Sequence, residues 1–103
     1  MADDFPTALA DGIVNLATGD IASDGTVITV TTGFAPRHVK LVNTTDVIVW
    51  EKLAGMGATE TVKTVTAGTT TIDTTTAIAF TATGFTVSAA AAGTGKALVW
   101  LAE

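Results

Sequence analysis

The feature that most constrains this chain is its density of β-branched residues between closely spaced turn signals. The 103 residues include 22 threonines and 11 valines. Both residue types restrict the first side-chain torsion and suit a pleated strand better than a helix. Glycine, asparagine and aspartate recur at short intervals and divide the chain into runs of strand length. The sequence therefore predicts an all-β fold, a single β-sandwich or jelly-roll-like domain of about eight strands.

The expected strands are the β-forming runs between these turns, and Thr18-Gly19-Asp20 is expected to be one of the turns. The runs are 13–17, 26–32, 38–42, 47–52, 59–66, 69–72, 77–81, 85–89 and 97–101. The predicted core consists of large apolar residues in these runs: Val27, Val39, Leu41, Ile48, Trp50, Val65, Ile78, Phe80, Phe85, Val87, Val99 and Trp100. Two of the runs, 47–52 and 97–101, are apolar on both faces, which is typical of a central strand or of a subunit contact.

The length of the chain allows one domain with one modest core. We expect an N-terminal arm at 1–12 and a β-sandwich domain at 13–103. The arm carries Phe5 and Pro6 and has no evident strand partner in its own chain. It begins with acidic residues and lacks the basic-then-apolar order of a signal peptide, so assembly in the cytoplasm is expected.

Composition argues against an enzyme. The chain has no cysteine, no tyrosine and one histidine, His38, so acid–base, thiolate and metal-ligating groups are scarce. A small hydrolase or lyase would need a pocket that unites His38 with a carboxylate, and no spacing suggests one. We expect no cofactor and no metal. His38 is interpreted as an ordinary strand residue on the same face as Lys40.

Charge and hydropathy exclude two further classes of partner. The net charge is −5, and a nucleic acid would be repelled by most of such a surface. The longest uncharged run, 74–95, spans 22 residues, but half of them are Thr, Ser or Gly. A membrane-spanning helix needs about 20 predominantly apolar residues. We therefore expect neither nucleic-acid nor membrane binding.

Two motifs resemble binding loops only in part. Gly93-Thr94-Gly95-Lys96 matches the end of a phosphate-binding loop, but Ala90 and Ala97 stand where that motif needs glycine and Ser or Thr. It is interpreted as a hairpin turn. Asp20 and Asp24 are too few carboxylates for a calcium loop, and Asp24 is expected to cap a turn through its side chain.

The tryptophans and one glycine-rich loop are the candidate contact residues. Trp50 and Trp100 suit a core or subunit interface, although an exposed aromatic face would suit a carbohydrate-binding module. The loop 53–58 places Leu53 and Met56 among small residues, where an apolar side chain either folds back or docks on a neighbour.

An ordered series of segments from Gly33 to Trp100 resembles small virion proteins of tailed bacteriophages. The series consists of Gly33-Phe34-Ala35-Pro36-Arg37-His38-Val39-Lys40-Leu41-Val42-Asn43, Asp46, Trp50-Glu51, Gly55-Met56, Lys63-Thr64-Val65, Ala67-Gly68-Thr69 and Gly84-Phe85-Thr86-Val87. The resemblance covers about two-thirds of the chain.

The resemblance implies a capsid decoration (cement) protein that binds the major capsid protein on the virion surface. A tail- or fibre-associated protein would have the same composition. The resemblance also implies a homotrimer, in keeping with the two strands that are apolar on both faces. Contacts with the capsid or with other subunits are expected from Phe5, Pro6, Trp50, Leu53 and Met56.

Overall fold

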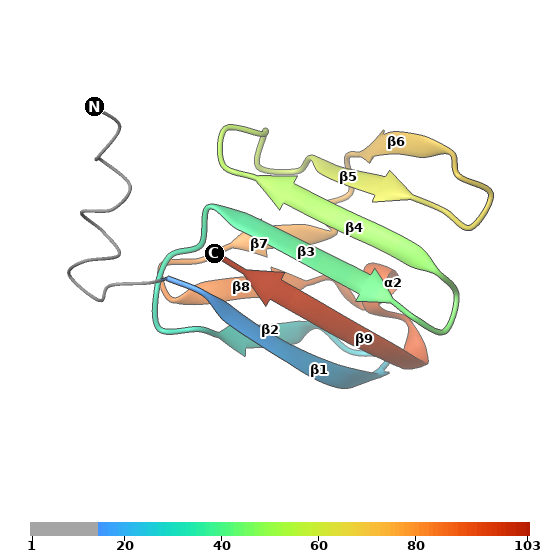
Figure 1. Cartoon of the computed structure of the whole chain (residues 1–103), viewed down its shortest axis with the longest axis horizontal. Helices are drawn as coiled ribbons and strands as arrows, with labels where there is room; N and C mark the ends of the chain where they lie inside the picture. Colours follow the sequence, from blue (N-terminus) through green and yellow to red (C-terminus); the bar gives the residue numbers. More distant parts are fainter. Residues whose placement is uncertain (1–14) are drawn as a thin grey trace, which may run out of the picture.

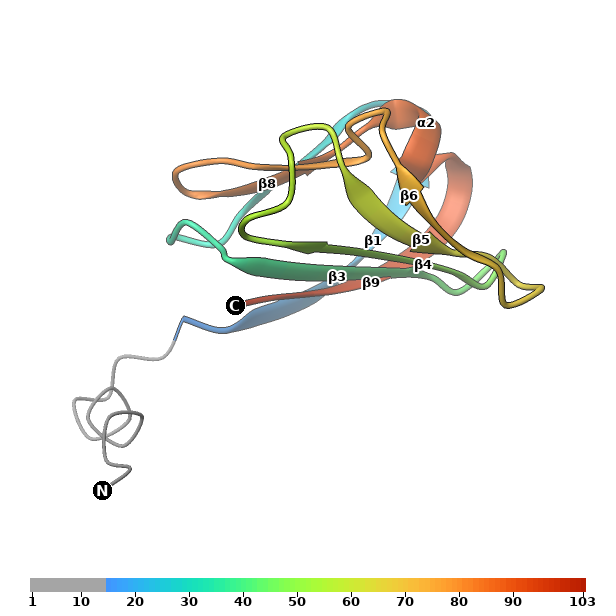
Figure 2. The same cartoon turned by 90° about the horizontal axis from the view of Figure 1, so that it is seen from above.

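The computed structural model describes residues 15–103, which form two antiparallel sheets packed face to face (Figures 1 and 2). The predicted all-β sandwich is therefore confirmed. Its elements are β1 (Ala17–Asp24), β2 (Ile28–Thr31), β3 (His38–Asn43), β4 (Ile48–Leu53), β5 (Thr61–Thr64), β6 (Thr70–Asp73), β7 (Ile78–Phe80), β8 (Gly84–Val87), α2 (Ala89–Ala92) and β9 (Thr94–Ala102). The predicted arm at 1–12 lies outside the described residues.

The larger sheet has six strands in the order β1-β9-β3-β4-β5-β6. Strands β3 to β6 follow one another as a meander, and β9 returns to pair with β3 on one side and β1 on the other. The smaller sheet has three strands in the order β2-β8-β7. Figure 2 shows this smaller sheet and α2 on one side of the larger sheet.

One hydrophobic core lies between the sheets. The larger sheet contributes Val39, Leu41, Trp50 and Leu98, and the smaller sheet contributes Val30, Ile78, Phe85 and Val87. Three predicted core residues are wrong. Val27 precedes β2 and is 59% exposed, and Val99 is 41% exposed because it alternates with the inward-facing Leu98 and Trp100. Val65 follows β5 and is not among the residues that form the core or pack against it.

The first strand is a second correction. Thr18-Gly19-Asp20 lies inside β1, eight residues long, and not in a turn. Gly19 pairs with Trp100 on β9, and a Cβ atom at Gly19 would lie 2.7 Å from the indole Cζ2 of Trp100. The glycine is needed for the close approach of this ring, since a strand glycine often marks such a contact.

The segment before β9 is a third correction. Ser88 caps the short helix α2 by accepting a hydrogen bond from the amide of Ala91 at 3.1 Å. Gly93 ends the helix with a φ of 72°, and β9 begins at Thr94. The segment 93–96 thus joins a helix to a strand and carries the chain from the smaller sheet to the larger one. It is not a hairpin.

Truncation of Phe85 and of Phe80 to alanine should lower the free energy of unfolding by different amounts. Phe85 is fully buried and packs edge-on against Trp100, with ring centroids 5.4 Å apart. We expect Phe85→Ala to lower the free energy of unfolding by about 3–5 kcal/mol. Phe80 is only half-buried, so Phe80→Ala should cost clearly less. Urea unfolding followed by tryptophan fluorescence measures both, and equal losses would contradict this assignment.

Two aspartates cap turns through the threonine two residues later. Asp24 Oδ1 accepts hydrogen bonds from the hydroxyl and the amide of Thr26, at 2.6 and 3.2 Å, as the turn interpretation of Asp24 predicted. Asp73 Oδ1 likewise accepts from the hydroxyl and the amide of Thr75. The hydroxyl of Thr26 lowers the pKa of Asp24, and the hydroxyl of Thr75 lowers the pKa of Asp73, below the ordinary value of 3.8.

These lowered pKa values give stability a defined dependence on pH. The stabilisation is fully present above pH 3.8, the ordinary value, and it is lost as the pH falls through the lower values of the folded state, because the unfolded state binds protons first. We expect the double variant Asp24→Ala/Asp73→Ala to lose less stability than the native protein between neutral pH and pH 2–3. Urea unfolding across this range measures the slope. Identical slopes would contradict the assignment.

Candidate interaction surface

The loop that joins β4 to β5 is closed by its own hydrogen bonds. The amide of Met56 donates to the carbonyl of Leu53 at 3.2 Å, and the amide of Glu60 donates to the carbonyl of Gly57 at 3.0 Å. The carboxylate of Glu60 accepts a hydrogen bond from the amide of Gly57 at 2.8 Å. These hydrogen bonds restrain the loop 54–60 although it is rich in glycine and alanine.

A buried lysine binds this loop from the core side of the sheet. Lys52 is only 4% exposed, and its ammonium donates to the backbone carbonyls of Gly57, Ala58 and Glu60 at 2.9, 3.3 and 2.5 Å. The same ammonium lies 5.8 Å from the centroid of the Phe80 ring. Three carbonyl oxygens and an aromatic face compensate the charge for its loss of water.

Sequence reasoning missed Lys52, although the signal was present. Ile48 and Trp50 were predicted to face inward, and the same alternation places Lys52 inward two residues later. A lysine in that position needs acceptors, and the loop that follows supplies unpaired carbonyls. The chain therefore uses an internal cation to shape a surface loop.

The predicted contact residues fall in three different places. Leu53 is 48% exposed, and its backbone amide donates to the sulfur of Met56 at 3.3 Å, which brings the two residues together where β4 meets the loop. Trp50 is 4% exposed and belongs to the core; its part in any contact is to support the sheet from within. Phe5 and Pro6 lie outside the described residues.

The indole of Trp50 has one notable contact and one unpaired group. The ammonium of Lys63 lies 4.8 Å from the ring centroid, which is within cation–π range. Its Nε1 is buried and has no hydrogen-bond partner among residues 15–103. With Trp50 buried and Trp100 packed against the core, neither ring offers the flat exposed face that a carbohydrate-binding module would need.

His38 lies on β3 at the end of the larger sheet. Its Nε2 is 2.7 Å from a carboxylate oxygen of Glu51, and its Nδ1 is 3.5 Å from one of Glu103. His38 shares its face with Lys40, as the alternation predicted. Within 15–103 no group of three or more His, Cys, Asp or Glu side chains is arranged to hold a metal ion.

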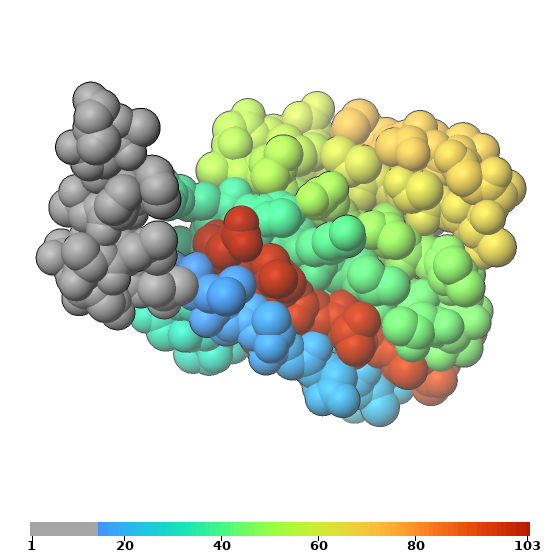
Figure 3. Space-filling view, in the orientation of Figure 1, coloured from blue at the N-terminus to red at the C-terminus, as the bar shows by residue number. Residues whose placement is uncertain are grey.

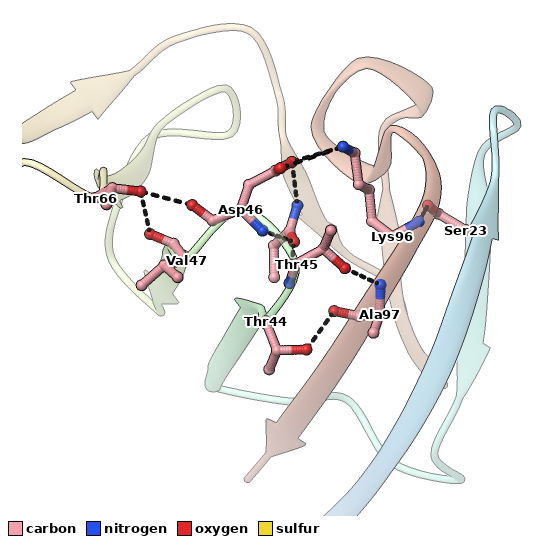
Figure 4. A network of polar contacts seen from close by, with 9 residues as sticks. Ser23, Thr44, Thr45, Asp46, Val47, Thr66, Lys96 and Ala97 are labelled. Carbon is pink, nitrogen blue, oxygen red and sulfur yellow. Dashed lines mark hydrogen bonds and ion pairs between the residues drawn. The ribbon is translucent and has the colours of Figure 1, made fainter.

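A rigid turn lies at the opposite end of β3 and β4 (Figure 4). Asp46 pairs with the ammonium of Lys96 at 3.1 Å, and the hydroxyl of Thr45 accepts a hydrogen bond from the amide of Ala97 at 2.9 Å. Val47 has a φ of 56°, a left-handed conformation that is strained for a β-branched residue. Thr66 holds it there by donating to the carbonyl of Asp46 at 2.6 Å.

One whole face of the larger sheet is not covered by any element of 15–103. We call it the outer face, and Figure 3 looks directly onto it. Of the six large apolar residues that are most exposed, four lie on this face or at its margin, and they are between 41% and 58% exposed. Ile72 and Val99 lie on the face itself, whereas Val47 and Leu53 lie at its margin, at the two ends of β4.

Comparison with known proteins gives no relative for this chain: no family model, no curated sequence and no solved structure matches it. In the part of the chain from Asn15 to Glu103, no helix is long and apolar enough to cross a membrane.

Removal of the Lys52 ammonium should loosen the loop. We expect Lys52→Met to lower the free energy of unfolding by about 1–3 kcal/mol, because buried carbonyls lose their donor. Hydrogen exchange at the amides of 54–60 should accelerate. The matched control is Lys63→Met, which removes a cation that faces Trp50 and should cost about 0.5–1 kcal/mol without faster exchange in the loop. Unchanged loop exchange in Lys52→Met would contradict the role of the buried lysine.

Proposed function

We propose that the protein is a structural virion protein that binds the surface of a tailed-phage capsid as a decoration protein. The observation that carries the proposal is the apolar loop surface of Leu53 and Met56, which is held in one conformation by the buried Lys52. A preformed apolar contact loses little conformational entropy on binding. A protein that binds a capsid surface needs preformed apolar contacts more than it needs catalytic side chains.

The resemblance of residues 33–100 to small virion proteins supports the same proposal. The all-β scaffold agrees with it, since a small sandwich provides a stiff body from which loops project. A tail- or fibre-associated role would use the same loop surface. A location on the head and a location on the tail must therefore be distinguished by experiment. The proposed partner is the major capsid protein.

The location is tested by mass spectrometry of heads and tails that are separated from purified virions of a phage encoding this chain. We expect the protein in the head fraction. Its presence in the tail fraction alone would support the tail-associated alternative, and its absence from both fractions would overturn the proposal.

The contact is tested by cosedimentation of the purified protein with capsids that lack it. We expect Leu53→Ser/Met56→Ser to weaken binding by at least tenfold, because apolar anchors dominate such interfaces. The matched control is Val27→Ser, which alters another exposed apolar residue away from the loop. Deletion of residues 1–6 tests the predicted contribution of Phe5 and Pro6. Equal binding by the loop variant and the control would remove the loop from the interface.

A further inference from the structure

We propose that the outer face pairs with the outer face of a second copy of this chain, related by a two-fold axis. The axis runs parallel to the strands, midway between β3 and β4. This inference goes beyond the proposed function and does not depend on where the protein is located. It rests on the pattern of apolar and charged residues over the six strands.

The outer face is apolar at its centre. Val42 on β3 pairs with Val49 on β4 and with Val99 on β9. The neighbouring row contains Leu101 on β9 and Val62 on β5, with Ile72 beyond it on β6. An antiparallel sheet with one face in water normally alternates apolar and polar residues. These strands instead carry apolar side chains on both faces.

Two opposite charges stand at the middle of this apolar face. Lys40 and Glu51 are directly opposite one another on β3 and β4. A two-fold axis midway between these strands places Lys40 of each copy over Glu51 of the other. Facing sheets pack about 10 Å apart, a gap that a lysine and a glutamate side chain span together. The two ion pairs are therefore symmetric and lie at the centre of the contact.

The rest of the face is compatible with the same axis. Three strands lie on each side of it, so β9 of one copy faces β5 of the other, and β1 faces β6. Val42 then faces Val49, and Leu101 faces Val62. Asp20 on β1 faces Thr70 and meets no like charge, and the second aspartate of β1, Asp24, lies at the end of the strand beyond the paired rows. Because sheets are twisted, the strands of two facing sheets cross at about 30°. This rotation moves residues at the edges of the face out of alignment more than the residue pairs at its centre.

The alternative in-plane axis, perpendicular to the strands, fits poorly. It would place β3 over β3 of the second copy and bring Lys40 against either Lys40 or Val42. Burial of a charge without its partner is costly. The charge pattern therefore favours the axis parallel to the strands over the perpendicular one.

The size of the face is near that of a small dimer interface. If it were flat, a face of six strands about 4.8 Å apart and about five residues long would cover roughly 400–500 Å². Because β5 and β6 turn away from the outer face (Figure 2), the central strands β9, β3 and β4 make most of the contact. The relief of the side chains increases the accessible area toward the ~800 Å² that each partner buries in a standard interface. A shallow depression of about 330 Å³ over β1 and β9, lined in part by Asp20, Ala22, Ala97 and Val99, leaves space for side chains of the second copy.

The test is sedimentation velocity of the full chain between 1 and 100 µM. We expect a dimer of twice 10.4 kDa. Lys40→Glu places two like-charged pairs at the centre, and it should weaken the dimer by at least about 30-fold in Kd. Lys40→Glu/Glu51→Lys exchanges the charges and should restore most of the affinity. Because Glu51 also contacts His38, the thermal stability of each variant is measured in parallel.

Two matched controls accompany these variants. Arg37→Glu makes the same change of charge at an exposed position outside the strands and should leave the dimer intact. Val99→Ser on the outer face should weaken the dimer, whereas Val27→Ser should not.

A monomer at 100 µM would overturn the proposal, as would a trimer of the kind that the resemblance implies. A dimer that tolerates Lys40→Glu would also overturn it. If the full chain is monomeric and deletion of residues 1–14 makes it dimeric, the N-terminal segment is the occupant of the outer face.

Discussion

The strand on which the fold most depends is β9, because it joins parts of the chain that are otherwise far apart. It pairs with β1 from the beginning of the described chain and with β3 from the meander. Its inward residues Leu98 and Trp100 pack into the core, and the ring of Trp100 lies over Gly19. Since β9 follows all the other strands in the sequence and lies between β1 and β3, the larger sheet is completed only when β9 is in place.

Side-chain polar contacts in this protein order the turns and loops between strands, whereas the packing of apolar residues places the strands themselves. Asp46 and Thr45 tie the turn between β3 and β4 to β9, and Lys52 ties the next loop to the body of the sheet. In both cases a side chain in a strand or next to one bonds to backbone or side-chain groups that the strands themselves leave unpaired. The strained backbone at Val47 persists because Thr66 and the ion pair of Asp46 hold the turn on both sides.

Much of the fold could be predicted from the sequence, because alternation and turn residues are local signals. Eight of the nine strands lie within or overlap closely the expected runs, β1 being the exception. That strand was misplaced because Gly19 is also a turn residue, and its real requirement, the ring of Trp100, comes from the far end of the chain. The helix α2 was missed although Ser88 followed by four alanines is a local capping signal.

The candidate surfaces were less predictable, for a physical reason. The sequence shows Leu53 and Met56 in or beside a glycine-rich loop, but that loop is ordered by the hydrogen bonds of Lys52. The burial of Lys52 depends on the packing of β4 against β7 and Phe80. Val99 and Trp100 were both placed in the core, although adjacent residues of a strand point to opposite faces. The 41% exposure of Val99 shows that apolar content and burial are separate properties in a strand that is apolar on both faces.

The composition of the outer face argues that this exposure is functional. Threonine and valine have nearly the same shape and similar strand propensity, and this chain uses threonine freely: Thr18, Thr64 and Thr70 occupy outward positions on β1, β5 and β6, where Val62 and Ile72 also face outward. Valine stands instead at 42, 49 and 99, in adjacent register on the central strands. A face that served only solubility would carry threonine there. The valines, with Lys40 and Glu51 in the neighbouring row, mark the part of the sheet that the proposed dimer would cover.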